Sequence, residues 1–281
     1  EIYTLSLHDA LPISISLSPS SLGKNENFSW EKSGKFNIGF DFSLFKDRLY
    51  GGIEYYNNRT IGLISSVPYA PSFGYSSYYD NIGNMSNQGV ELDLHGVPVR
   101  TKDLEWTIYA NVTSNHNKIT ELAEARKTQK VWDVDSDGNL IQEYKGYSSS
   151  AYFYTEGQSR YTYYTKRFAG IYNEDTYSKT GDASYDPSNG GQAMYWKNVK
   201  DQDGNVTGTI ATLNGSEGDF YVSGNVLPRV YGGFGTSLSF KGFYLSVDFQ
   251  YQLGGKVFDS EYQSLMAFRD GYGYHVDLLK D

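Results

Sequence analysis

The sequence predicts an all-β protein: part of a large antiparallel transmembrane β-barrel that is incomplete within its 281 residues. Three observations support this prediction. Apolar and polar residues alternate over long segments, short turns join these segments in pairs, and the connections between pairs are long. Period-two alternation gives a strand one apolar and one polar face. Short turns on one side and long loops on the other are typical of outer-membrane barrels.

The first predicted hairpin joins strands at about residues 35–45 and 49–59 through the charged turn 46–48. One face of its first strand is entirely apolar and consists of Phe36, Ile38, Phe40, Phe42 and Leu44. Asn37, Asp41 and Ser43 lie on the opposite face. The length of each strand matches the ~9–11 residues that a tilted strand needs to span a bilayer.

Two further hairpins repeat this pattern. One joins residues 87–98 to 104–116, and the other joins 229–240 to a strand ending at 253. Aromatic residues lie close to the short turns, namely Phe45, Trp106, Phe240 and Phe243. They fit an aromatic girdle at a membrane surface. The core of a soluble β-sandwich is the alternative.

The long connections, at about 60–86 and 117–228, are predicted to be extracellular loops. The strand before the second loop runs outward and the strand after it runs inward. This loop therefore contains either no spanning strand or an even number, and the sequence leaves both open. Residues 15–34 are predicted to be a loop, and residues 35–281 a partial barrel. Residues 1–14 have neither strand alternation nor a basic start, and they resemble a translated sequencing adapter, so we expect a non-native leader.

Composition excludes several classes of protein. No apolar run reaches the 18 residues of a membrane helix. The net charge of −9 and the lack of a basic stripe argue against a nucleic-acid partner. Common catalytic motifs such as HExxH and GxSxG are absent. Glu54, Glu91, Asp93, Glu105 and Asp248 fit a solvated barrel wall better than an acid/base pair. We therefore expect no enzyme and no catalytic residues.

Five stretches together resemble the SusC-like (RagA-like) TonB-dependent transporters of Bacteroidetes outer membranes. They are NENFSWEKSGKFNIGFDFSLFKDRLYGGIEYYNNRT, SVPYAPSFGYSS, NIGNMSNQGVELDLHGVPVRTKDLEWTIYANVTSNHNKI, RFAGIYNEDTYSKTG and VLPRVYGGFGTSLSFKGFYLSVDFQYQLGGKVFD. The resemblance covers most of residues 25–259. It implies a 22-stranded plugged barrel in the outer membrane, surrounded by its lipid. Such a barrel imports glycans or peptides with a SusD-like surface lipoprotein, driven by a TonB complex.

This sequence lacks the plug, the signal peptide and the closing strands of that family. We therefore expect a fragment that does not transport alone, because an unclosed barrel leaves open strand edges in lipid. The alternative function is a soluble carbohydrate-binding β-sandwich.

Two loops are rich in tyrosine, whose flat ring and polar tip suit stacking on a sugar or a peptide. The candidate substrate contacts are Tyr75, Tyr78, Tyr79, Tyr152, Tyr154, Tyr161 and Tyr163. Packing within the loops is the alternative role for each of them.

One acidic segment matches the start of a calcium-binding loop. Asp133, Asp135 and Asp137 occupy positions 1, 3 and 5, a glycine follows at position 6, and Asn139 comes next. The bidentate glutamate expected at position 12 is missing, so an ordinary acidic turn is the alternative. The similar segment at residues 201–205 is better explained as a hairpin turn. Calcium is the only cofactor that the sequence suggests.

Overall fold

The computed structural model describes residues 22–23, 25–68, 72, 74–265, 273 and 276. The leader predicted at residues 1–14 lies outside the described residues. Six long strands form one antiparallel sheet in the order β17-β16-β7-β6-β3-β2. These strands are β2 (Lys32–Leu44), β3 (Leu49–Ile61), β6 (Gly83–Arg100), β7 (Leu104–Leu122), β16 (Val230–Phe240) and β17 (Phe243–Leu253). The three predicted hairpins are confirmed.

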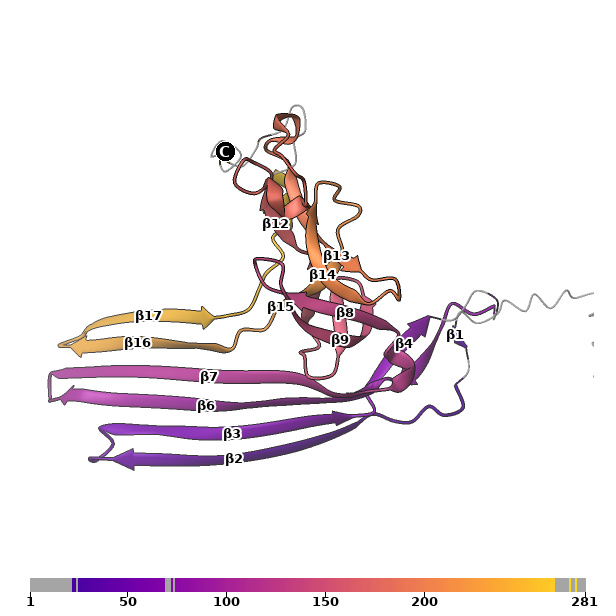
Figure 1. Cartoon of the computed structure of the whole chain (residues 1–281). Coiled ribbons are helices and arrows are strands. Elements are labelled where there is room, and N and C mark those ends of the chain that lie inside the picture. Colours follow the sequence, from indigo (N-terminus) through magenta and orange to yellow (C-terminus); the bar gives the residue numbers. More distant parts are fainter. Residues whose placement is uncertain are drawn as a thin grey trace, which may run out of the picture.

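The short turns lie together at one end of this sheet, and the long connections leave from the other end (Figure 1). The turn between β16 and β17 consists of Lys241 and Gly242, with φ values of 45° and 90°. Two consecutive residues with positive φ make the tight turn whose twist matches that of a hairpin. Glycine is suited to the second position because it has no Cβ to oppose this conformation.

Strands β6 and β7 are longer than the alternation predicted, since they cover residues 83–100 and 104–122. Their backbones stay paired beyond the apolar segment, for example at Asn87↔Asn117 and Met85↔Ile119. The alternation stops there because the outward face becomes polar, as at Ser86 and Lys118, while backbone pairing does not depend on side-chain polarity. Strand β2 likewise begins at Lys32, inside the loop predicted at 15–34.

Strands β7 and β16 pair directly over eleven residues, from Val230↔Ser114 to Phe240↔Leu104. The connection predicted at 117–228 therefore adds no strand of its own to the described six-stranded sheet, although its first residues, up to Leu122, extend β7. This answers the question that the sequence left open.

Instead, the long insertion folds on its own at the end of the sheet opposite the short turns (Figure 1). A small closed barrel has the strand order β10-β11-β15-β8-β9. Its strands are β8 (Gln129–Val134), β9 (Leu140–Ser149), β10 (Tyr152–Thr155), β11 (Thr162–Lys166) and β15 (Phe220–Asn225). A second sheet contains β12 (Phe168–Ile171), β13 (Ala193–Lys200) and β14 (Val206–Thr212).

Three shorter helical turns accompany these strands, namely η2 (Glu124–Arg126), η3 (Tyr177–Thr180) and η4 (Pro187–Asn189). The other long connection forms a small sheet of β1 (Leu22–Gly23), β4 (Ile64–Pro68) and β5 (Ser77–Asn81). Helix α2 (Ser260–Leu265) follows the last strand. Within the described residues, no helix is long and apolar enough to cross a lipid bilayer.

The two larger hydrophobic cores lie in the insertion, and a smaller one lies at the β4–β5 hairpin. One core gathers fully buried side chains such as Tyr172, Met194 and Tyr221, and a second surrounds Phe153. In the long sheet, large apolar side chains are exposed instead, including Ile38 at 60% and Leu245 at 58%. No second sheet covers this apolar face among the described residues, so the β-sandwich alternative is wrong for this structure.

Candidate functional site

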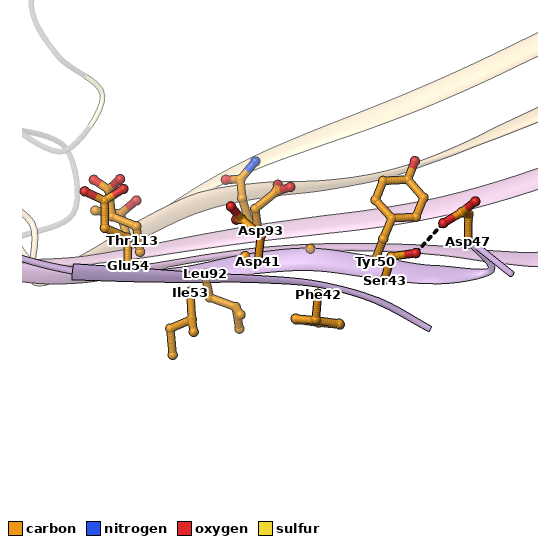
Figure 2. Close-up of a pocket in the computed structure, with 15 residues that line it drawn as sticks. Asp41, Phe42, Ser43, Asp47, Tyr50, Ile53, Glu54, Leu92, Asp93 and Thr113 are labelled. Carbon is orange, nitrogen blue, oxygen red and sulfur yellow. Dashed lines mark hydrogen bonds between the residues drawn. The ribbon is translucent and has the colours of Figure 1, made fainter. Parts of the chain in front are cut away.

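The long sheet has two chemically distinct faces. Its register places apolar residues beside apolar residues, and polar residues beside polar residues, on neighbouring strands. Ile53 pairs with Leu92, which pairs with Val112 on the next strand. On the other face, Asp93 pairs with Asn111, and Glu54 pairs with Glu91. Figure 2 shows this division, with Asp41, Glu54, Asp93 and Thr113 on one side and Phe42, Ile53 and Leu92 on the other.

The polar face contains the carboxylates that the sequence placed on a barrel wall. Asp41, Glu54, Glu91 and Asp93 line one broad open depression that crosses β2, β3 and β6. Within the described residues, no three acidic or histidine side chains are arranged to hold a metal ion. These side chains face open space, so the arrangement is that of a solvated wall.

An aromatic stack on the polar face was missed by the sequence reasoning. The rings of Tyr50 and His95 are parallel with centroids 4.9 Å apart, and Tyr109 lies on the other side of His95 at 5.8 Å. His95 Nε2 lies 2.9 Å from a carboxylate oxygen of Asp93. The three rings belong to three neighbouring strands and share one row of the register. The alternation in the sequence places the three rings on the polar face. Only the pairing of the three strands brings the rings into contact.

The row of rings ends at Gly235 on β16, which pairs with Tyr109. A Cβ at this position would lie 2.5 Å from Tyr109 Oη and 2.6 Å from a carboxylate oxygen of Asp248. The missing side chain of glycine therefore leaves the space that the tyrosine hydroxyl occupies.

Three of the seven predicted substrate-contact tyrosines lie together on the β10–β11 hairpin. Tyr152 stacks on Tyr163 with ring centroids 5.5 Å apart, and its ring meets Tyr161 edge-on at 6.4 Å. Tyr161 is 40% exposed, whereas the hydroxyl of Tyr163 accepts a hydrogen bond from the backbone N–H of Phe258. The hairpin thus presents a partly exposed group of three rings in the insertion.

The other four candidates are not part of this group. Tyr154 stacks on Tyr147 at 4.8 Å, and Arg126 lies 5.8 Å above the Tyr147 ring. Tyr78, like Tyr147, packs against the small core of the β4–β5 hairpin. Tyr75 and Tyr79 are exposed at 39% and 48%. Packing accounts for Tyr78 and Tyr154, and the two tyrosine-rich loops meet through this shared core.

The acidic segment forms the turn of the β8–β9 hairpin. Both carboxylate oxygens of Asp135 accept hydrogen bonds, from the backbone N–H groups of Asp137 and Asn139 and from the Asn139 side chain. The turn at Asp201 between β13 and β14 has the same pattern, with bonds from Asp203 and Asn205. Residues 201–205 are thus confirmed as a hairpin turn. In both turns the aspartate at the start of the turn, Asp135 or Asp201, accepts local hydrogen bonds. Calcium binding at residues 133–139 stays a prediction.

Asp133 lies outside this turn and has different contacts. It lies in β8, where its carboxylate is 3.9 Å from the Arg167 guanidinium. Burial raises the pKa of Asp133, although the nearby positive charge of Arg167 opposes this effect. Hydrogen bonds from the Asn139 side chain and backbone instead lower the pKa of Asp135. The two carboxylates therefore have different surroundings.

Comparison with known proteins agrees with the arrangement of the sheet. Residues 12–278 match the family model for the TonB dependent receptor-like β-barrel. The TonB-dependent receptor SusC of Bacteroides thetaiotaomicron is 35% identical over 137 residues, which are 46% of this chain and 14% of SusC. The TonB-dependent receptor P3 of Formosa agariphila is 27% identical over 234 residues, which are 83% of this chain and 21% of that receptor.

The solved structure of the RagAB peptide importer in its open-open state is also similar. The TM-score is 0.59 at 25% identity, covering 83% of this chain and 22% of that one. The chain therefore spans about a fifth of the length of the full receptors that it matches over most of its residues. Since the family model covers nearly the whole chain, this protein belongs to the TonB-dependent receptor family and contains part of its β-barrel domain.

Proposed function

We propose that this chain is part of the barrel wall of an outer-membrane transporter of the SusC/RagA type. Such a transporter imports an oligosaccharide or a peptide together with a SusD-like lipoprotein, using energy from a TonB complex. The observation that carries this proposal is the continuous apolar face of the six-stranded sheet. Its register keeps apolar side chains together from Phe36 on β2 to Phe249 on β17.

The height of this face supports a membrane location. On β2 it extends from Phe36 to Leu44, and on β7 from Leu104 to Val112. Eight residue steps of ~3.3 Å, tilted by ~40°, correspond to roughly 20 Å along the membrane normal. Outer-membrane barrels have an apolar band of about 25 Å. The exposed aromatic side chains Phe45 and Phe243 lie next to the short turns, as a girdle requires.

The edges of the sheet favour a larger barrel. Neither β2 nor β17 has a second partner among the described strands. In lipid, each unpaired backbone group costs several kcal/mol, so spanning sheets must close. We therefore infer that further strands of the complete transporter pair with these two edges. The chain supplies a segment of the wall, and transport belongs to the whole barrel.

Labelling of intact cells tests the orientation. In the complete transporter, an epitope inserted after Gly204, in the β13–β14 turn, should bind antibody on intact cells. The same epitope after Gly242, in the β16–β17 turn, should bind only after the outer membrane is permeabilised. Surface labelling at Gly242 would contradict the proposal.

The partly exposed rings of Tyr152, Tyr161 and Tyr163 are the part of the insertion best suited to contact substrate. Tyr161 is exposed and the other two rings are partly exposed, and the insertion that carries them lies at the end of the sheet opposite the short turns (Figure 1). Stacking of a sugar or a peptide group on such rings tolerates different ligands because only the flat face is needed.

Uptake by the complete transporter tests this role. Tyr161→Ala should reduce uptake of the substrate, whereas Tyr161→Phe should retain it because the ring is kept. Tyr244→Ala is the matched control, since Tyr244 is also exposed but lies beside a short turn at the opposite end. Equal uptake by Tyr161→Ala and the control would exclude Tyr161 from substrate contact.

A further inference from the structure

A groove with two cations lies on the outward face of the sheet, just beyond the apolar band. It crosses β3, β6 and β7 and has a volume of about 460 Å³. Arg59, Ser86 and Lys118 form one row of the register across its floor. Asn57 and Gln88 form the next row towards the membrane.

The alternation fixes the side of the sheet on which this groove opens. Arg59 follows Ile53 and Tyr55 at steps of two, and Lys118 follows Ile108 and Val112 in the same way. Side chains two residues apart on a strand share a face. Both cations therefore lie on the face that meets lipid and not on the face that lines the barrel.

The distance of the two cations from the apolar band favours a large headgroup. Arg59 lies four residues beyond Tyr55, roughly 10 Å along the membrane normal, and Lys118 lies six residues beyond Val112, roughly 15 Å. The headgroup layer of an ordinary bilayer is only about 5–8 Å thick on each side. A lipid whose headgroup carries sugars extends far enough to reach both cations.

The polar groups of the groove fit a phosphorylated sugar. Arg59 and Lys118 are both exposed, and neither has an ion pair or side-chain hydrogen bond with another described residue. Asn57 Oδ1 is buried and has no hydrogen-bond partner among the described residues, so it can accept a bond from a hydroxyl. No carboxylate of the described residues lines the groove, and Glu121, which pairs with the lining residue Asn84, accepts a hydrogen bond from the Asn84 side chain. Guanidinium and ammonium groups are the usual partners of phosphate.

We propose that this groove binds the phosphate-bearing sugar headgroup of a lipid in the outer leaflet. Arg59 and Lys118 hold the phosphate, and Asn57 accepts a hydrogen bond from a sugar hydroxyl. Its continuity with the lipid-facing apolar surface selects a membrane lipid as the occupant. The inference rests on the orientation proposed above, in which the long loops face outward.

Lipid binding by the complete transporter in detergent tests the proposal. Native mass spectrometry would compare a phosphorylated glycolipid with the same lipid after removal of its phosphate. The double variant Arg59→Gln/Lys118→Gln should bind the phosphorylated lipid at least about tenfold more weakly, since each charge-assisted hydrogen bond is worth about that factor. Lys35→Gln is the matched control, because Lys35 is an exposed cation on the inward face of β2.

Each result is decisive. Equal binding by the wild type and the double variant, or an equal loss in Lys35→Gln, would overturn the proposal. Displacement of the lipid by excess inorganic phosphate would also overturn it, since the site would then be one for a free anion. Substrate uptake by the double variant should be unchanged. Correct epitope labelling without lipid binding would reject the lipid site and leave the proposed function intact.

Discussion

Placing a positive charge at the middle of the apolar band should strongly destabilise the barrel. Ile108 is four residues from each end of the band on β7, or roughly 10 Å from either membrane surface. Its partners on the neighbouring strands are Gly96 and Thr236, neither of which can neutralise a cation. The Ile108→Lys side chain would therefore lie in lipid without a counter-ion.

The expected cost follows from this depth. A lysine at the bilayer midplane on the lipid face of a barrel costs about 2–4 kcal/mol. This range corresponds to a decrease of roughly 30- to 800-fold in the folding equilibrium constant. The adjacent residue Thr107 lies on the inward face, so Thr107→Lys adds the same charge to the solvated wall. Its effect should stay within about 0.5 kcal/mol, as for other surface substitutions.

Folding of the complete transporter into lipid vesicles, as a function of denaturant concentration, measures both variants. Ile108→Leu serves as a packing control, because it keeps an apolar side chain of the same volume. If Ile108→Lys and Thr107→Lys change the free energy of unfolding equally, the assignment of the outward face is wrong.

Three further predictions concern other parts of the structure. Phe153→Ala should lower the stability of the insertion by about 3–5 kcal/mol, seen as faster limited proteolysis, because Phe153 is 0% exposed; unchanged proteolysis would contradict its place in the core. Gly235→Ala should cost about 1–3 kcal/mol in denaturant unfolding, since the new methyl group displaces the Tyr109 hydroxyl; a neutral effect would show that the stack adjusts freely. The pKa of Asp135 is lowered in the folded turn, so its contribution to stability is present above the ordinary carboxyl pKa of about 3.9 and is lost as the pH falls through the lowered value. Hydrogen-exchange protection of the Asn139 amide should therefore decrease on acidification through this range, and Asp135→Ala should remove this dependence. Equal protection in the wild type above and below this range would contradict the prediction.

Local patterns were sufficient to predict the hairpins of the long sheet. Alternation and turn residues act between neighbours in the chain, so the turn at Lys241–Gly242 and the strands that it joins could be read directly. The turn at residues 201–205 was predicted for the same reason. Strands β6 and β7 were predicted to be shorter than they are, because their backbone pairing continues beyond the apolar band without an alternating pattern.

The two faces of the sheet could be assigned from the sequence, since the period of a strand places alternate residues on opposite sides whatever their partners are. Which strands are neighbours across long gaps in the chain became known from the fold. It joined β7 to β16 and left the insertion outside the sheet. It also aligned Tyr50 with His95, and Arg59 with Ser86 and Lys118. These rows depend on the register of backbone hydrogen bonds between distant segments, and no local pattern specifies that register.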